Sequence, residues 1–87
     1  MVSREWVEAF CQERDCDVLL ADGFEAALVG VGRRFNTYVA IYDMHQCLAV
    51  LCAQGMTEDE ADEYFEFNVV GAHVGDQTPI FLDTECK

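Results

Sequence analysis

The functional groups that stand out most in the 87-residue chain are carboxylates, which are concentrated in one short segment. Between positions 58 and 66, Asp and Glu recur at three- and four-residue spacing, which on a helix puts neighbouring side chains within about 6 Å of each other. Such a row can imitate the phosphate spacing of a nucleic acid. It can equally be the solvated face of a surface helix whose first-turn acids favour the helix dipole. The candidate partner-binding residues are Glu58, Asp59, Asp62, Glu63 and Glu66.

The charge around this run has one sign. The chain has a net charge of −12, and from Phe35 to Cys86 it contains no Lys or Arg. A field this negative repels nucleic acid and anionic membranes, and it speeds association with basic surfaces. We therefore expect no direct binding to nucleic acid or membrane, and a basic or nucleic-acid-binding protein as the partner.

Cysteine and histidine side chains form no recognisable metal or catalytic motif. Two pairs share C-x4-C spacing, Cys11 with Cys16 and Cys47 with Cys52. Five residues advance about 140° beyond a full helical turn, so the second pair diverges on a helix even with His45 nearby. Neither histidine accompanies a nucleophile in an elbow or a phosphate loop. We expect no metal, no cofactor and no catalytic residue, and so not an enzyme.

A pair of basic residues follows two glycines. Gly30-Val31-Gly32 before Arg33-Arg34 is a weak cue for phosphate binding, because the third glycine and the following helix of that motif are absent. The same residues suit a hairpin strand with an exposed basic pair. Arg33 and Arg34 are therefore candidates for contact with a small anion, or with the acidic face of another copy in a homodimer or larger assembly.

Composition indicates a single folded domain spanning residues 1–87. Hydrophobic residues make up 52% of the chain, which argues against disorder despite the charge. The first residues lack the apolar core of a signal peptide, and no apolar run approaches the roughly 18 residues of a membrane span. We expect a cytoplasmic protein whose thiols are reduced.

Local patterns predict an α+β fold that begins with a helix and a β-hairpin. Apolar spacing over Ser3–Arg14 fits an amphipathic helix with Ser3 as N-cap. Alternation from Ala27 onwards predicts one strand, and the β-branched and aromatic residues of Tyr38–Tyr42 predict a second. A turn at positions 35–37 joins them into an antiparallel hairpin. The two glycines in the first strand indicate a bulge or a close backbone contact.

The second half predicts an αα-hairpin followed by a strand. Asp43 and Thr57 each begin a helix with a capping-box partner three residues later, and Gly55 ends the first of the two helices. The second helix carries apolar residues from Ala61 to Ala72. Pro79 then leads into a last strand, Ile80–Leu82, which completes a small three-stranded sheet.

Several sequence blocks between Asp22 and Leu82 form a distinctive set. They are Asp22-Gly23-Phe24, residues 27–32, residues 40–43, residues 63–72, Val74-Gly75 and Thr78-Pro79. The set resembles a family of small proteins encoded by tailed bacteriophages and prophages, although His73 stands where that family has an aromatic residue. The resemblance supplies no catalytic or binding residues.

What the resemblance implies is a setting in bacterial host cytoplasm, where small acidic phage proteins inhibit host or defence proteins. The expected function is an inhibitor or modulator, such as a DNA mimic or an anti-CRISPR-like factor. One alternative is a small-ligand or nucleotide-binding protein, with a pocket formed by Tyr42, Phe67, Asn68, Gly71 and Gly75. Another alternative is a structural component of the virion.

Overall fold

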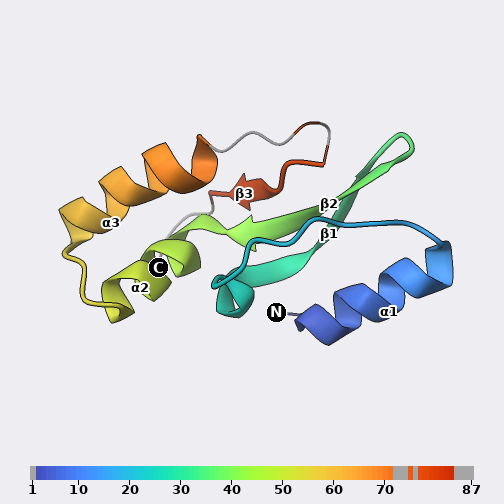
Figure 1. Cartoon of the computed structure of the whole chain (residues 1–87), viewed down its shortest axis with the longest axis horizontal. Helices are drawn as coiled ribbons and strands as arrows, with labels where there is room; N and C mark the ends of the chain where they lie inside the picture. The colour runs from blue at the N-terminus through green and yellow to red at the C-terminus, as the bar shows by residue number, and fades with distance from the viewer. Residues whose placement is uncertain (1, 72–74, 76, 84–87) are drawn as a thin grey trace.

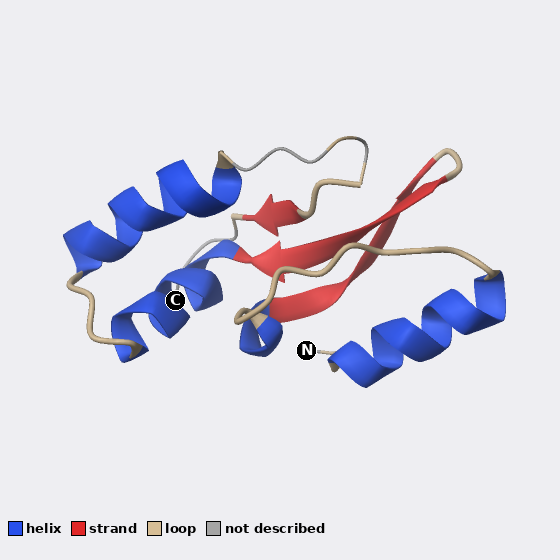
Figure 2. Ribbon diagram, in the orientation of Figure 1, coloured by secondary structure: helices blue, strands red, loops and turns tan. Residues whose placement is uncertain are grey.

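The chain folds around a short mixed β-sheet with helices at both ends (Figure 1). The computed structural model describes residues 2–71, 75 and 77–83. Its elements, in order, are α1 (Arg4–Arg14), the 3-10 turn η1 (Glu25–Ala27), β1 (Leu28–Arg34), β2 (Thr37–Asp43), α2 (Met44–Ala53), α3 (Glu58–Tyr64), the π-helix η2 (Phe65–Val70) and β3 (Ile80–Leu82). The predicted α+β class and the order of its elements are confirmed (Figure 2).

Helix α1 begins and ends at residues suited to those positions. The hydroxyl of Ser3 accepts a hydrogen bond of 3.1 Å from the Trp6 backbone N–H, as predicted for an N-cap. Asp15 ends the helix in the left-handed conformation, with φ 53°. Val7 is the buried residue of the helix.

Strands β1 and β2 form the antiparallel hairpin. Their register runs from Leu28 opposite Tyr42 to Arg34 opposite Thr37, with a bulge between Leu28 and Gly30. The bulge confirms one of the two predicted alternatives. A Cβ atom added at Gly32 would lie 2.8 Å from Ile41 Cδ1, so the close neighbour of this glycine is a side chain and not the backbone. The first strand starts one residue later than predicted, because the backbone up to residue 27 closes the 3-10 turn.

Strand β3 runs parallel to β2 at the other edge of the sheet. Ile41 pairs with Ile80 and Asp43 with Leu82, giving the strand order β1-β2-β3. Parallel neighbours need a long connection, which here consists of α2, α3 and the π-helix. The strand follows Pro79, as predicted.

The αα-hairpin is defined by its caps. The Asp43 carboxylate accepts a 3.1 Å hydrogen bond from the Gln46 N–H, and Thr57 and Glu60 exchange both bonds of a capping box. Gly55 has φ 107°, and the amides of residues 55 and 56 bond back to the carbonyls of residues 52 and 51. This is the Schellman pattern, in which a glycine adopts the left-handed conformation that ends a helix.

The core is a single apolar cluster between the sheet and the helices. Its largest fully buried side chains are Tyr42, Phe65, Leu28, Leu51, Val7 and Cys47. The Tyr42 ring stacks on Phe81 at 5.9 Å between centroids, and Phe81 meets Phe65 edge-on at 5.2 Å. The Tyr42 hydroxyl accepts a 2.7 Å bond from the Ala21 N–H, so its polar atom is satisfied. Among the described residues, no helix has the length and apolar character needed to cross a bilayer.

Replacing Tyr42 by Phe tests this buried hydroxyl. We expect the free energy of unfolding to fall by about 1–2 kcal/mol, because the Ala21 N–H loses its acceptor inside the protein. Urea denaturation of Tyr42→Phe measures the change. The matched control is Tyr38→Phe, which removes the same atom from a half-buried ring and should cost less than about 0.5 kcal/mol. Equal stabilities for the two variants would contradict the assignment.

The buried Cys47 thiol predicts a loss of stability in alkali. Burial, with a contribution from Asp43, raises the pKa of Cys47 from its ordinary value of 9.0 to about 12. Above pH 9 the thiol of the unfolded chain loses its proton, while the buried thiol of the folded chain keeps its proton until about pH 12. The free energy of unfolding is therefore unaffected by this group below pH 9 and falls between pH 9 and pH 12, by up to about 4 kcal/mol. Urea titrations at about pH 8 and about pH 11 should show a smaller fall for Cys47→Ala than for the parent. An unchanged pH slope in the variant would rule out this origin.

Candidate functional site

The five predicted partner-binding carboxylates lie together on one exposed surface, hereafter called the acidic face. Glu58, Asp59, Asp62 and Glu63 belong to α3, and Glu66 follows in the π-helix; all are exposed. Ala61 and Phe65, at 1% exposure each, anchor the opposite side of the same helix in the core. The helical spacing predicted from the sequence therefore places these carboxylates on the solvent side.

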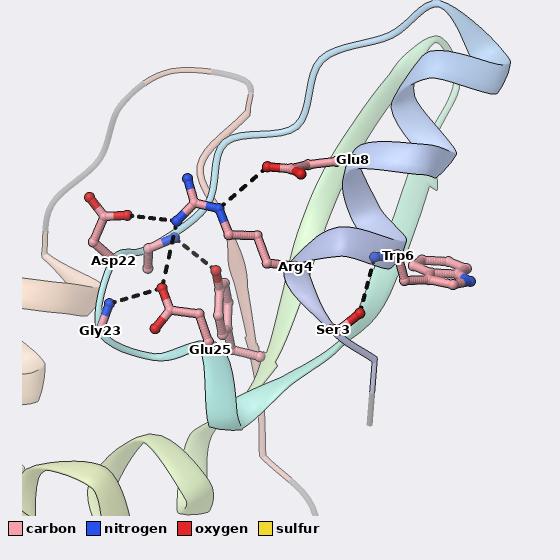
Figure 3. Close-up of polar contacts among 9 residues, drawn as sticks. Ser3, Arg4, Trp6, Glu8, Asp22, Gly23 and Glu25 are labelled. Atoms are coloured by element: carbon pink, nitrogen blue, oxygen red, sulfur yellow. Dashed lines mark hydrogen bonds and ion pairs between the residues drawn. The ribbon is translucent and has the colours of Figure 1, made fainter.

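No described cation lies close enough to neutralise the acidic face. Arg4, the basic residue nearest the start of the chain, is surrounded by carboxylates of Glu8, Asp22 and Glu25 at 3.7, 3.4 and 3.8 Å (Figure 3). Arg14 lies 4.0 Å from Glu13. Within the described part of the chain, none of the five carboxylates of the acidic face forms an ion pair, so their negative field is open to a partner.

The π-helix adds an aromatic ring to the acidic face. Its wider turn is closed by the Gly71 N–H, which bonds to the Glu66 carbonyl at 3.1 Å. Phe67 projects from this turn with 77% of its surface exposed. It lines an open depression of about 620 Å³ together with Asp59, Asp62, Glu63 and Glu66. Short π-helical turns occur frequently at functional sites.

The predicted basic pair lies at the end of the hairpin. Arg33, Arg34 and Phe35 form what we call the hairpin tip, and all three are exposed. The Arg33 Nε donates a 2.8 Å hydrogen bond to the Phe35 carbonyl, and its guanidinium lies 5.5 Å from the Tyr38 ring centre. The tip and α3 occupy opposite ends of the molecule (Figure 1). Within one chain, the two groups of opposite charge therefore do not meet.

Phe35 has an unusual backbone conformation. The pairing of Arg34 with Thr37 leaves Phe35 and Asn36 as a two-residue loop, and Phe35 has φ 54°. Of the two loop residues only Phe35 has a positive φ, as in a II′ turn, whose first position is normally Gly because a Cβ atom there is strained. The Phe35 ring is 86% exposed and gains no burial that would offset this strain.

A row of aromatic rings lies beside the tip, and the contact that joins the helix to Tyr38 in this row is not predicted by the sequence. Trp6 and Phe10 of α1 lie 5.4 Å apart between ring centres, and Phe10 meets the Tyr38 ring edge-on at 5.4 Å. The Arg14 guanidinium lies 4.1 Å from the centre of the Phe10 ring. The signal was available as the spacing of positions 6, 10 and 14, four residues apart along one helix stripe.

The residues suggested for a small-ligand pocket do not converge. Tyr42 is buried in the core, whereas Phe67 and Asn68 line an open depression of about 480 Å³ beside Met56 and Glu60. A separate apolar cavity of about 420 Å³ lies between the loop at residues 19–24, the π-helix and β3. Asn68 borders both cavities, but neither is lined by Gly71 or Gly75.

The described cysteines form no disulfide bond. Cys11, Cys16, Cys47 and Cys52 are all free. Burial, followed by a hydrogen bond with Cys16, raises the pKa of the Cys11 thiol. In the described part of the chain, no group of three or more His, Cys, Asp or Glu side chains is arranged to hold a metal ion. His73 and Cys86 lie outside the described residues.

Comparison with known proteins identifies no relative of this chain. No protein-family model, curated protein or solved structure matches the chain. The candidate site is therefore defined by its own geometry: an acidic face that forms no ion pair within the described residues, an exposed Phe67 beside it, and a basic tip at the opposite end.

Replacing Phe35 tests the strain at the tip. We expect Phe35→Gly to be more stable than Phe35→Ala by about 1 kcal/mol, because Gly adopts a positive φ without the clash of a Cβ atom. Urea denaturation of the two variants gives the difference directly, and both remove the same exposed ring. An alanine variant at least as stable as the glycine variant would show that the backbone at residue 35 is unstrained.

Proposed function

We propose that this chain is an acidic binding protein that uses the acidic face of α3 to occupy the basic surface of a partner protein. One observation supports this above all: five exposed carboxylates share one surface and form no ion pair within the described chain. Leaving like charges side by side costs folding energy. That cost is offset when a basic partner supplies the missing cations.

Phe67 supports a protein partner rather than a diffuse electrostatic contact. Interfaces depend on a few buried aromatic and arginine anchors, with charged residues around them setting specificity and association rate. A 77% exposed ring bordered by Asp59, Asp62, Glu63 and Glu66 has this layout. The partner would bury Phe67 in a small apolar recess and bring Lys or Arg to the surrounding carboxylates.

The proposed consequence is inhibition of a nucleic-acid-binding protein. Carboxylates repeated along a helix present acceptors to the same Arg and Lys side chains that hold phosphates. A protein covered in this way could not bind its nucleic acid at the same surface. The resemblance to phage and prophage proteins favours a bacterial host or defence protein as the target, so the chain would act as a DNA mimic or an anti-CRISPR-like factor.

The test compares two triple variants that lose the same charge. Asp62→Asn, Glu63→Gln and Glu66→Gln remove three charges from the acidic face. Glu5→Gln, Glu13→Gln and Asp17→Asn remove three charges at exposed positions in α1 and the loop after it. We expect the parent to capture a nucleic-acid-binding protein from bacterial lysate at low salt, and added duplex DNA to compete. Affinity for the purified partner should fall about 10- to 100-fold in the first variant only.

Two outcomes would remove this proposal. One is capture of no basic or nucleic-acid-binding protein. The other is equal capture by both triple variants, which would mean that only the net charge matters. Circular dichroism of each variant confirms that the fold is retained.

A further inference from the structure

We propose that the hairpin tip of one copy docks into the acidic face of a second copy, so that the protein associates head to tail. This inference rests on the proposed function only in taking the acidic face as a docking surface. The occupant here is a second copy of the chain, identified by the charges and rings that the two ends present.

Charge complementarity is the first reason. Arg33 and Arg34 are the two described basic residues that form no ion pair with a described carboxylate, and both lie at the tip. The acidic face offers five clustered carboxylates that form no ion pair with any described residue. The molecule measures 40 × 23 × 23 Å, with tip and face at opposite ends of its long axis (Figure 1). Only another molecule can bring the two together.

The shape of the tip is the second reason. Successive side chains of a strand point to opposite faces of the sheet, so Arg33 and Arg34 project to the two sides of the tip with Phe35 at its end. Arg33 is already held by its bond to the Phe35 carbonyl and by the Tyr38 ring. A pre-organised guanidinium loses less conformational freedom when it binds a carboxylate.

Phe35 is the third reason. Its ring is 86% exposed at a backbone position that favours Gly, so neither burial nor backbone geometry explains an aromatic residue there. Strained residues are found where function requires them. In the docked pair, Phe35 would enter the depression beside Phe67, and one arginine would lie on each side to meet carboxylates along α3. Buried aromatic pairs of this kind stabilise interfaces.

The net charge of −12 on each copy sets the salt dependence. At about 0.01 M salt the Debye length is about 30 Å, so the two molecules repel each other as a whole. At about 0.1 M it is about 10 Å, which screens the distant charges but leaves the contacting pairs effective. At about 1 M the pairs themselves weaken. Association should therefore be strongest near physiological salt.

A charge-swap experiment tests the contact. Variant one carries Arg33→Glu and Arg34→Glu, and variant two carries Asp62→Lys and Glu63→Lys. By sedimentation at about 0.1 M salt, we expect the parent mass to rise with concentration above that of a monomer. Tip-to-face contacts can close an antiparallel pair or continue into a longer row of copies. Each variant alone should stay monomeric. In variant one the tip and the face are both negative, and in variant two the new lysines at positions 62 and 63 repel the arginines of the tip at the centre of the face. Their mixture should associate again.

Phe35→Gly adds a readout that a structural role would not produce. It should weaken association about tenfold while the fold keeps or gains stability. The inference is overturned if the parent is monomeric, if the variants associate as the parent does, or if the mixture of variants remains monomeric. Variant one also separates the two proposals, because it keeps the acidic face. Suppose that variant one captures the basic partner and the parent never self-associates. This result would support the proposed function and overturn the head-to-tail contact.

Discussion

The contact between three aromatic rings holds the acidic helices to the sheet. Tyr42 in β2 stacks on Phe81 in β3, and Phe81 meets Phe65 at the start of the π-helix, so the row crosses from the sheet to the layer that carries the charge. Among the described residues no cation lies near α3 to attract it, and its carboxylates repel one another. Apolar burial must therefore supply the attachment, and Ala61 and Phe65 provide it on the inner side of the same helix.

The aromatic residues are likewise divided into a buried set and an exposed set. Tyr42 and Phe65 are fully buried and stabilise the fold, whereas Phe35 and Phe67 are exposed at the two charged ends. Each exposed ring lies where the local backbone departs from the commonest geometry, a left-handed residue in the hairpin loop and a π-helical turn after α3. The core gains nothing from either ring, and both stand beside side chains of a single charge.

Sequence patterns predicted the local features of the fold well, because each depends on a few neighbouring residues. Ser3, Asp43 and Thr57 cap helices as expected, and Gly55 ends one. The parallel direction of β3 depends on where a long connection returns, which no local pattern records. The sequence predicts one continuous helix where the structure has α3 followed by a π-helix, since Phe65 and Val69 fit either helix type. Every residue of the acidic face was predicted from the sequence. The position of Phe67 beside that face and the strained φ of Phe35 depend on the backbone conformation, which the sequence pattern does not specify.

Strand β3 has a further consequence for how the molecule assembles itself. The β-hairpin and the αα-hairpin each join residues that are close in sequence, whereas the pairing of Ile41 with Ile80 closes a loop of the intervening chain. Loop closure is entropically costly and is repaid only when the contacts at its end are ready. A strand of three residues repays little by itself, so its docking depends on both hairpins being in place and on Phe81 entering between their rings. We therefore expect β3 to pair last in folding, with Phe81 coupling the β-hairpin to the αα-hairpin through its contacts with Tyr42 and Phe65.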